Sequence, residues 1–281
     1  MNSFALQFSE SISASPVIKW AGGKRQLLPE LKRRLPSSYN RYFEPFIGGG
    51  ALYFDIAPFD AYISDINPEL VNLYEVIRDD VEALISDLSS HENSLEYYNE
   101  IRALDKNPNY TNISPVRKAS RFIYLNKTCF NGLYRVNRKG FFNVPFGRYT
   151  NPNFLNKESL YAASEVLQTT QIECASFENI LNFVKKGDFV YFDPPYIPLS
   201  QTASFTSYSK EDFGMDKQVQ LKSLCDKLSA MGVNFMLSNS DTPISNELYS
   251  EYNVEKIYAS RSINSKANGR GKIAEIIVRN Y

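Results

Sequence analysis

Two periodicities of hydrophobic residues alternate along the chain. Short runs rich in β-branched and aromatic residues predict strands at residues 41–46, 61–65, 170–175, 189–192, 234–239, 254–259 and 273–278. Apolar residues at helical spacing predict helices at residues 51–56, 158–168, 177–184 and 210–231. This alternation is typical of an α/β protein, in which helices cover both faces of a mostly parallel sheet.

The middle of the chain breaks this alternation. Helical patterns there cover residues 68–88, 95–105 and 115–129. The following segment, 131–152, is rich in turn residues and aromatics and predicts a hairpin with long loops. We therefore expect residues 1–67 and 156–281 to form one doubly wound, Rossmann-like domain, with residues 68–155 as an inserted, mainly helical subdomain.

Length and composition place the chain among globular proteins. Its 281 residues, 43% of them hydrophobic, are enough for one large core with a smaller subdomain. No segment resembles a signal peptide and no run of 18 apolar residues could span a bilayer, so we expect a cytoplasmic protein without a membrane partner. The three cysteines lie far apart, and the chain has one histidine. This speaks against a disulfide scaffold, a metal site and histidine catalysis, and nothing indicates an obligatory protein partner.

The formal net charge is zero, but the charges are unevenly distributed. Ten Lys and Arg residues and no acid lie from Lys106 to Lys157, interleaved with aromatics. A solvated face is the common explanation for a run of like charge. Basic side chains mixed with aromatic ones are also typical of a surface that binds a polyanion. In that case we expect Arg117, Lys118 and Arg121 to present charge to phosphates from one helix.

A glycine turn follows the first predicted strand. In FEPFIGGGA, residues Gly48, Gly49 and Gly50 have no Cβ that would keep a ligand away from the backbone. Asp65, fifteen residues past Gly50, ends the next strand, where an acid can accept hydrogen bonds from ribose hydroxyls. The turn fits neither the dinucleotide nor the triphosphate pattern, which favours a nucleoside cofactor without phosphates, such as S-adenosylmethionine. A purely structural turn is the alternative.

A polar tetrad, Asp193-Pro194-Pro195-Tyr196, follows the predicted strand FVYF. An exocyclic amine on a purine is a poor nucleophile, because its lone pair is delocalised into the ring. Acceptors for both N–H groups would make it reactive, and the Asp193 carboxylate and the Pro194 carbonyl could supply them. Proline fixes φ near about −65° and has no N–H that would compete for this carbonyl. Tyr196 could stack on an extruded base, although a strand end with a packed aromatic is the simpler alternative.

Six segments form a known succession of motifs. They are KWAGGKRQLLPEL, RYFEPFIGGGALYFDI, ISDINPELVNLY, NGLYRVNRKGFFNVPFGRY, FVYFDPPYIPLS and RGKIAEIIV. They resemble the motifs of the Dam-type DNA adenine-N6 methyltransferases, occur in that family's order and cover nearly the whole chain. FNGLYRVN and FNVPFGRY resemble most closely the members that modify GATC.

The resemblance implies a Rossmann-like methyltransferase that acts on double-stranded DNA. Such an enzyme transfers a methyl group from S-adenosylmethionine to N6 of an adenine flipped out of the helix, with GATC as the site. Residues 1–67 and 156–281 would bind the cofactor and carry catalysis, whereas residues 68–155 would recognise the DNA target. No metal is implied, and the enzyme would associate with the nucleoid through its DNA.

The resemblance and the glycine turn together assign the expected site residues. The expected catalytic residues are Asp193, Pro194, Pro195 and Tyr196. The expected cofactor contacts are Trp20, Lys24, Phe46, Gly48, Gly50, Asp65 and Asp193. The expected DNA contacts are Lys19, Phe130, Asn131, Leu133, Arg135, Pro145 and Arg148. Phe130 stands where some members of the family have tyrosine, so any hydroxyl contact is lost while stacking remains.

Other functions are weighed against this one. Protein glutamine methyltransferases use a related tetrad that begins with Asn and lack a basic inserted subdomain. Cytosine-C5 methyltransferases need a cysteine nucleophile next to a proline, and no cysteine of the chain adjoins one. A non-catalytic DNA-binding protein would explain the basic segment but not the tetrad and the glycine turn. RNA in place of DNA is compatible with the charge pattern.

Overall fold

The structure is a computed structural model, and it describes residues 14–198, 213–260 and 272–281. The chain divides into two compact units. The first, here called the helical unit, comprises Met1–Gly23, Ile47–Phe59 and Ser64–Cys174. The second, here called the sheet unit, comprises Lys24–Phe46, Asp60–Ile63 and Ala175–Tyr281. Each unit is described by itself.

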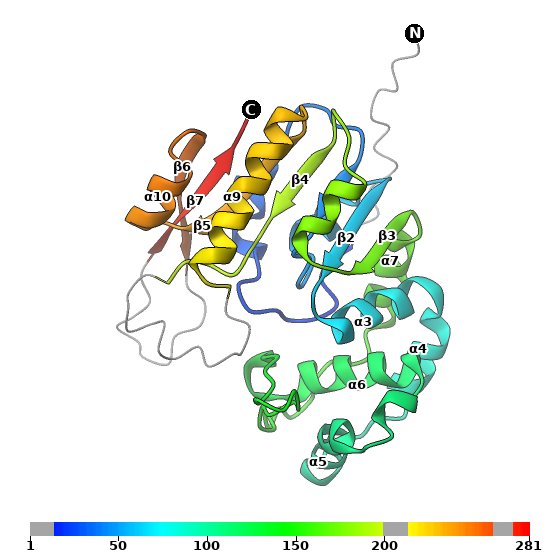
Figure 1. Cartoon of the computed structure of the whole chain (residues 1–281). Helices are drawn as coiled ribbons and strands as arrows, with labels where there is room; N and C mark the ends of the chain where they lie inside the picture. The colour runs from blue at the N-terminus through cyan, green and yellow to red at the C-terminus, as the bar shows by residue number, and fades with distance from the viewer. Residues whose placement is uncertain (1–13, 199–212, 261–271) are drawn as a thin grey trace. The chain divides into compact units, whose positions relative to one another are not determined.

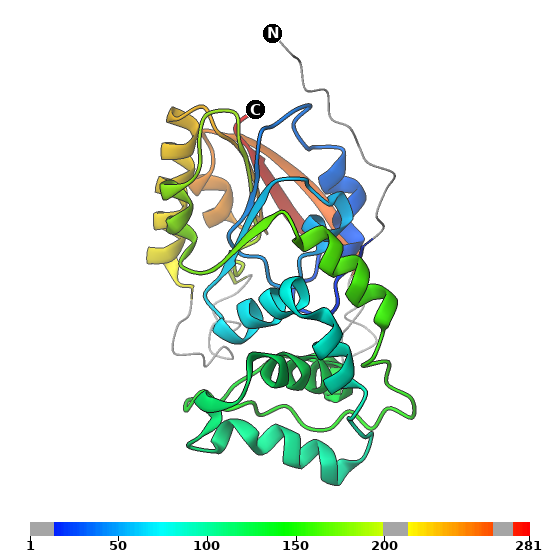
Figure 2. The same ribbon diagram turned by 90° about the vertical axis from the view of Figure 1, so that its right-hand side faces the viewer.

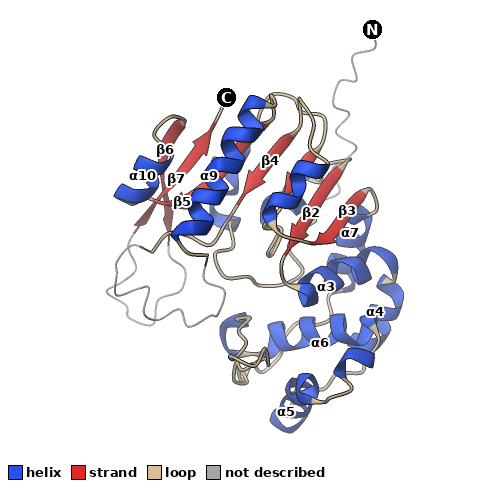
Figure 3. Ribbon diagram, in the orientation of Figure 1, coloured by secondary structure: helices blue, strands red, loops and turns tan. Residues whose placement is uncertain are grey.

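Seven strands form one sheet in the order β3-β2-β1-β4-β5-β7-β6, drawn in red in Figure 3. The strands are β1 (Tyr42–Glu44), β2 (Ala61–Asp65), β3 (Thr170–Cys174), β4 (Phe189–Phe192), β5 (Asn234–Ser240), β6 (Asn253–Ser260) and β7 (Lys272–Arg279). Strand β1 pairs in parallel with β2 and β4, and β4 pairs in parallel with β5. Strand β7 runs antiparallel to β5 and β6. The predicted fold class, an α/β protein with a mostly parallel sheet, is confirmed.

Alternate residues of the central strands face opposite sides of the sheet. Val190 and Phe192 of β4 join a buried apolar cluster with leucines of α9 (Met215–Ala230), the helix that lies across β4 and β5 in Figure 1. Phe189 instead contacts Tyr42 of β1, with ring centroids 5.9 Å apart. Within the described residues, the other helices of the sheet unit are η1 (Arg25–Leu27), α1 (Leu28–Lys32), η5 (Phe177–Asn182) and α10 (Pro243–Leu248). Burial on both faces explains why β4 is an unbroken apolar run.

The helical unit is built around α6 (Pro115–Thr128), which packs against three other helices of this unit (Figure 2). Its helices are α2 (Ala51–Ile56), α3 (Pro68–Asp79), α4 (Val81–Leu88), α5 (Leu95–Ala103), α6 and α7 (Lys157–Leu167), with the short turns η2 (Leu104–Lys106), η3 (Tyr110–Asn112) and η4 (Phe130–Gly132). Side-chain oxygens cap the first turns of four of them: Asn67 caps α3, Ser94 caps α5, Ser114 caps α6 and Asn156 caps α7.

Three elements differ from the sequence prediction. The helix expected over 68–88 is two helices, because Asp80 leaves helical geometry at φ −148° and ψ 48°. The helix expected over 177–184 is the 3-10 helix η5. The hairpin is present only as two isolated bridges, Cys129 with Phe146 and Val136 with Phe142. Residues 210–212, where the last long helix was expected to begin, lie outside the described residues.

Within the described residues, the helices are too short or too polar to cross a membrane.

Candidate functional site

In the sheet unit, the tetrad begins where β4 ends, and a lysine contacts its carboxylate. The Nζ atom of Lys24 lies 2.8 Å from Oδ1 of Asp193, and the exposed fractions of the two side chains are 6% and 21%. Burial raises the pKa of the Asp193 carboxyl above its ordinary value, although the ammonium of Lys24 opposes this rise. Among the described residues, no donor reaches Oδ2 of Asp193, so this oxygen can accept a hydrogen bond from a ligand.

Buried polar side chains hold the backbone that follows the tetrad carboxylate. Gln218 of α9 donates its Nε2 to the carbonyl of Pro195 at 2.9 Å, and Ile197 N donates to Asn239 Oδ1 at 3.1 Å. Asn239 in turn donates to Gln218 Oε1 at 3.2 Å. The carbonyl of Pro194 receives no hydrogen bond from the part of the chain that is described. The hydrogen bonds from Gln218 and to Asn239 therefore fix the backbone from Pro195 to Ile197, and they leave the carbonyl oxygen of Pro194 available to a ligand.

Tyr196 is held at both ends of its side chain. Its hydroxyl donates to Oε2 of Glu275 on β7 at 2.7 Å, and the Nζ atom of Lys24 lies 4.6 Å from the centre of its ring. Burial, together with the carboxylates of Asp193 and Glu275, raises the pKa of Tyr196 well above its ordinary value, so the phenol stays neutral. One lysine thus contacts both the acid and the aromatic residue of the tetrad.

In the helical unit, the glycine turn and Asp65 contact each other. Gly48 N donates to Asp65 Oδ2 at 3.2 Å, and Asn67 N donates to Asp65 Oδ1 at 3.0 Å. Burial raises the pKa of Asp65, whereas these backbone N–H groups lower it. Gly48 and Gly50 have φ angles of 44° and 65°, which only glycine adopts readily. Each carboxylate oxygen keeps a second lone pair, so Asp65 can accept further hydrogen bonds from a ribose.

Trp20 lies directly against this turn. A Cβ added to Gly48 would come 2.6 Å from Cδ1 of the indole, so the turn requires glycine for Trp20 to pack there. Phe46, by contrast, belongs to the sheet unit, where its ring stacks on Phe177 at 5.3 Å. The expected cofactor contacts are thus divided between the units: Trp20, Gly48, Gly50 and Asp65 belong to the helical unit, and Lys24, Phe46 and Asp193 to the sheet unit.

All seven expected DNA contacts lie in the helical unit, on loops that adjoin α6. Phe130 and Leu133 are 52% and 39% exposed, so both apolar side chains are accessible to a partner. Arg135 is exposed, and its Nε donates to Asn143 Oδ1 at 2.7 Å. Pro145 accepts a hydrogen bond from Phe130 N at 2.9 Å.

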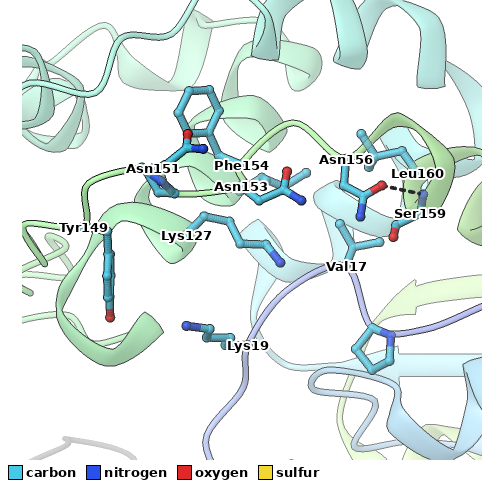
Figure 4. A pocket seen from close by; sticks show the side chains of 13 residues that line it. Val17, Lys19, Lys127, Tyr149, Asn151, Asn153, Phe154, Asn156, Ser159 and Leu160 are labelled. Carbon is cyan, nitrogen blue, oxygen red and sulfur yellow. Dashed lines mark hydrogen bonds between the residues drawn. The ribbon is translucent and has the colours of Figure 1, made fainter.

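Lys19 lines a cavity of about 300 Å³ within the helical unit (Figure 4). Its backbone is fixed by Asn126, which accepts from Lys19 N and donates to Lys19 O, both at 2.8 Å. Lys127 and Tyr149 line the same cavity, and the Nζ atom of Lys19 lies 5.5 Å from the centre of the Tyr149 ring (Figure 4). Sequence reasoning did not select Lys127 and Tyr149 as contacts. Both lie in the basic segment, and Tyr149 also ends the motif FNVPFGRY, which was a signal for it.

The alignment of three cations along α6 for phosphates, expected from the sequence, is wrong. Arg121 is buried, with its Nη2 atom 2.8 Å from Asp105 Oδ2 and its Nε donating to a backbone carbonyl. Arg117 pairs with Asp87 at 2.9 Å, and Lys118 donates to the carbonyl of Thr111. The acids that pair with these arginines lie outside the acid-free segment, so the segment considered alone overstates the available charge.

The single histidine has a structural environment. His91 is hydrogen-bonded to Tyr97 and Ser120, and its ring stacks on Tyr124 at 4.5 Å. Burial lowers its pKa to about 4, so it is neutral near pH 7. Within the described ranges, His, Cys, Asp and Glu side chains form no group that could hold a metal ion.

Comparison with known proteins gives consistent matches over most of the chain. The family model described as D12 class N6 adenine-specific DNA methyltransferase matches residues 20–263. A type II methyltransferase of Lactococcus lactis subsp. cremoris, M1.LlaDCHI, is 49% identical, with 96% of each chain covered. The type II methyltransferase M.MjaIII of Methanocaldococcus jannaschii is 41% identical over 96% of this chain and 100% of its own. A DNA adenine methylase of Serratia marcescens is 36% identical over 92% of this chain and 96% of its own.

Proposed function

Since the chain belongs to the D12 class of N6 adenine-specific DNA methyltransferases, which use S-adenosylmethionine to methylate adenine, we propose that it modifies GATC in duplex DNA by flipping the adenine out. The observation that carries the catalytic assignment is the tetrad after β4. There a carboxylate oxygen and a proline carbonyl are both available to a ligand, while buried side chains hold the peptide between Pro195 and Ile197.

The chemistry assigned to the tetrad is activation of the adenine amine. Oδ2 of Asp193 and the carbonyl of Pro194 each accept one N–H, so the amine rehybridises and its lone pair becomes available. S-adenosylmethionine would supply the methyl group from its sulfonium and leave as S-adenosylhomocysteine, a neutral thioether, while the methylated nitrogen would lose one proton to solvent. The Lys24 ammonium holds Asp193 through its other oxygen, so the carboxylate keeps one orientation during the reaction.

The residues around the glycine turn fit a nucleoside cofactor. Asp65 has lone pairs for the ribose hydroxyls, and its buried carboxylate is kept in place by two backbone donors. A Cβ at Gly48 would meet Trp20, so the turn allows an aromatic ring and the backbone to lie close together. We assign these residues to cofactor binding together with Lys24 and Phe46.

Base flipping is assigned to Tyr196, and its two substitutions should differ. Tyr196→Ala should lose stacking on the order of 1 to 3 kcal/mol for the extruded adenine, whereas Tyr196→Phe keeps the aromatic face and loses the bond to Glu275. Fluorescence of 2-aminopurine at the target position measures extrusion. We expect a much weaker signal for Ala than for Phe. Equal signals and equal rates from the two variants would contradict the stacking role.

We assign target recognition to residues 68–155, with Lys19 contributing from outside this range. The exposed apolar and basic side chains near the end of α6 support this assignment. The apolar side chains can contact bases while the neighbouring cations contact phosphates. Double-stranded DNA is the proposed partner, and binding to it would place the protein at the nucleoid in the cytoplasm.

Transfer of tritium from labelled S-adenosylmethionine tests the proposal directly. We expect label in duplexes that contain GATC, little label in duplexes with one base of the site changed, and none in RNA or protein. Digestion of the product should yield N6-methyladenine. Label in RNA or glutamine side chains would contradict the proposed substrate, and equal labelling of all duplexes would contradict the proposed site.

A further inference from the structure

Tyr134 lies at a junction of the helical unit, and none of the roles assigned above uses it. Its ring stacks on that of Trp20, with centroids 5.6 Å apart and planes at 25°. It stacks more closely on Phe122 of α6, at 4.9 Å and 21°. Burial raises the pKa of its hydroxyl, and the side chain of Asn67, which lies near this hydroxyl, opposes that larger rise. Three segments that are distant in sequence thus meet on one aromatic side chain.

Two of these contacts lead to the cofactor elements. Trp20 lies between Tyr134 and the glycine turn, because a Cβ on Gly48 or Gly49 would come within 2.6 or 3.0 Å of it. Asn67 caps α3, and its backbone N–H donates to Asp65 at 3.0 Å. A change in the position of Tyr134 would therefore move the indole that covers the turn and the residue that supports the acid.

The remaining contacts lead to the hairpin. Tyr134 directly precedes Arg135, whose carbonyl accepts from Asn143 N at 3.0 Å and whose Nε donates to the same residue. The ring of Tyr134 also contacts that of Phe142, with centroids 5.9 Å apart, on the opposite arm. Since isolated bridges are the only strand pairing of this hairpin, side-chain packing must fix where Arg135 points.

We propose that Tyr134 is a positioning residue that couples cofactor binding to recognition of the DNA site. Ordering of Trp20 and Asp65 around S-adenosylmethionine fixes the Tyr134 ring, and the fixed ring holds Arg135 in its base-reading position. The first ligand to bind then bears the entropic cost of ordering these residues. The second ligand binds residues that are already ordered, so each ligand tightens binding of the other. The inference rests on the proposed role of Arg135.

The protein contains one tryptophan, which makes the test direct. Fluorescence of Trp20 can follow binding of S-adenosylhomocysteine, which cannot methylate, in the presence and absence of saturating duplex. For the wild type we expect the GATC duplex to lower the dissociation constant at least about fivefold, and a shuffled duplex to lower it less. The coupling factor is the ratio of the dissociation constants without and with the GATC duplex. Tyr134→Leu should reduce this ratio to less than about two, whereas Tyr134→Phe should keep most of it because the ring still stacks on Trp20.

A matched control separates coupling from simple loosening of the hairpin. Phe142→Leu removes another aromatic that contacts Tyr134, but it leaves the stack of Tyr134 on Trp20 in place. It should weaken DNA binding but lower the coupling factor less than Tyr134→Leu does, because Tyr134 still stacks on Trp20 and still directly precedes Arg135. Should thermal unfolding show that Tyr134→Leu is not folded, Tyr134→Met, which fills the space with a flexible apolar chain, takes its place in the same titration.

Two outcomes would overturn the inference, and they differ from failure of the proposed function. The first is a Tyr134 variant that is folded, still prefers GATC and retains the wild-type coupling factor. The second is a wild type that prefers GATC but shows no coupling at all. A wild type that binds GATC and shuffled duplexes equally would instead contradict the recognition site, and the inference would fall with it.

Discussion

Asp193→Ala is expected to lower the rate of methyl transfer at least about a hundredfold at saturating cofactor and DNA. The substitution removes the acceptor for one adenine N–H, so the lone pair stays delocalised into the ring. It also leaves the Lys24 ammonium buried without its carboxylate partner. Since we propose that the helical unit binds duplex DNA, DNA binding should change little. Single-turnover transfer of tritium, together with a DNA-binding titration on the same preparation, measures both quantities.

Asp193→Asn provides the matched variant, because it keeps the shape of the side chain and removes the charge. It should also be strongly impaired, which would show that charge, and not volume, matters. Since burial raises the pKa of Asp193, the wild-type rate should fall on acidification at a higher pH than for an exposed aspartate. That acidic limb should be absent from the residual activity of the Asn variant. Transfer by Asp193→Ala within tenfold of the wild type would contradict the catalytic assignment.

The strands and the tetrad could be predicted because their signals are local. Four apolar residues followed by Asp-Pro-Pro can only end a strand there, and β4 ends at Phe192. The hydrogen bonds that hold the backbone from Pro195 to Ile197 could not be predicted in the same way. The side chains that make them, Gln218 and Asn239, lie on α9 and β5, and nothing in their neighbouring residues distinguishes a buried amide from an exposed one.

The basic segment illustrates the opposite error. Counting charge within the segment treats every cation as available, but long-range pairing decides how much charge remains. Arg121 is neutralised by Asp105, which lies one residue before the segment begins. Arg117 is paired with Asp87 of α4. A count of charges within one segment therefore does not show which of its cations can reach a nucleic acid.

Arg135→Ala is expected to lower kcat/KM on GATC by roughly 1 to 3 kcal/mol, which is about 5- to 150-fold, and to lower it much less on sites with one altered base. The guanidinium is exposed, and Asn143 holds it through Nε. This support orients the planar group, so its fork can pair with O6 and N7 of a guanine in the major groove. Loss of a base contact removes discrimination, because the altered sites never gained from that contact.

Lys139→Ala is the matched control, since Lys139 is an exposed cation on the same hairpin. Its loss should weaken all duplexes by the same factor and reduce the dependence of binding on salt by about one unit at most. Values of kcat/KM on GATC and its single-base variants, at two salt concentrations, distinguish the two kinds of contact. If Arg135→Ala lowered every substrate equally and Lys139→Ala did the same, both cations would act on the phosphate backbone. Recognition of GATC would then depend on the apolar contacts of Phe130 and Leu133 and on Lys19.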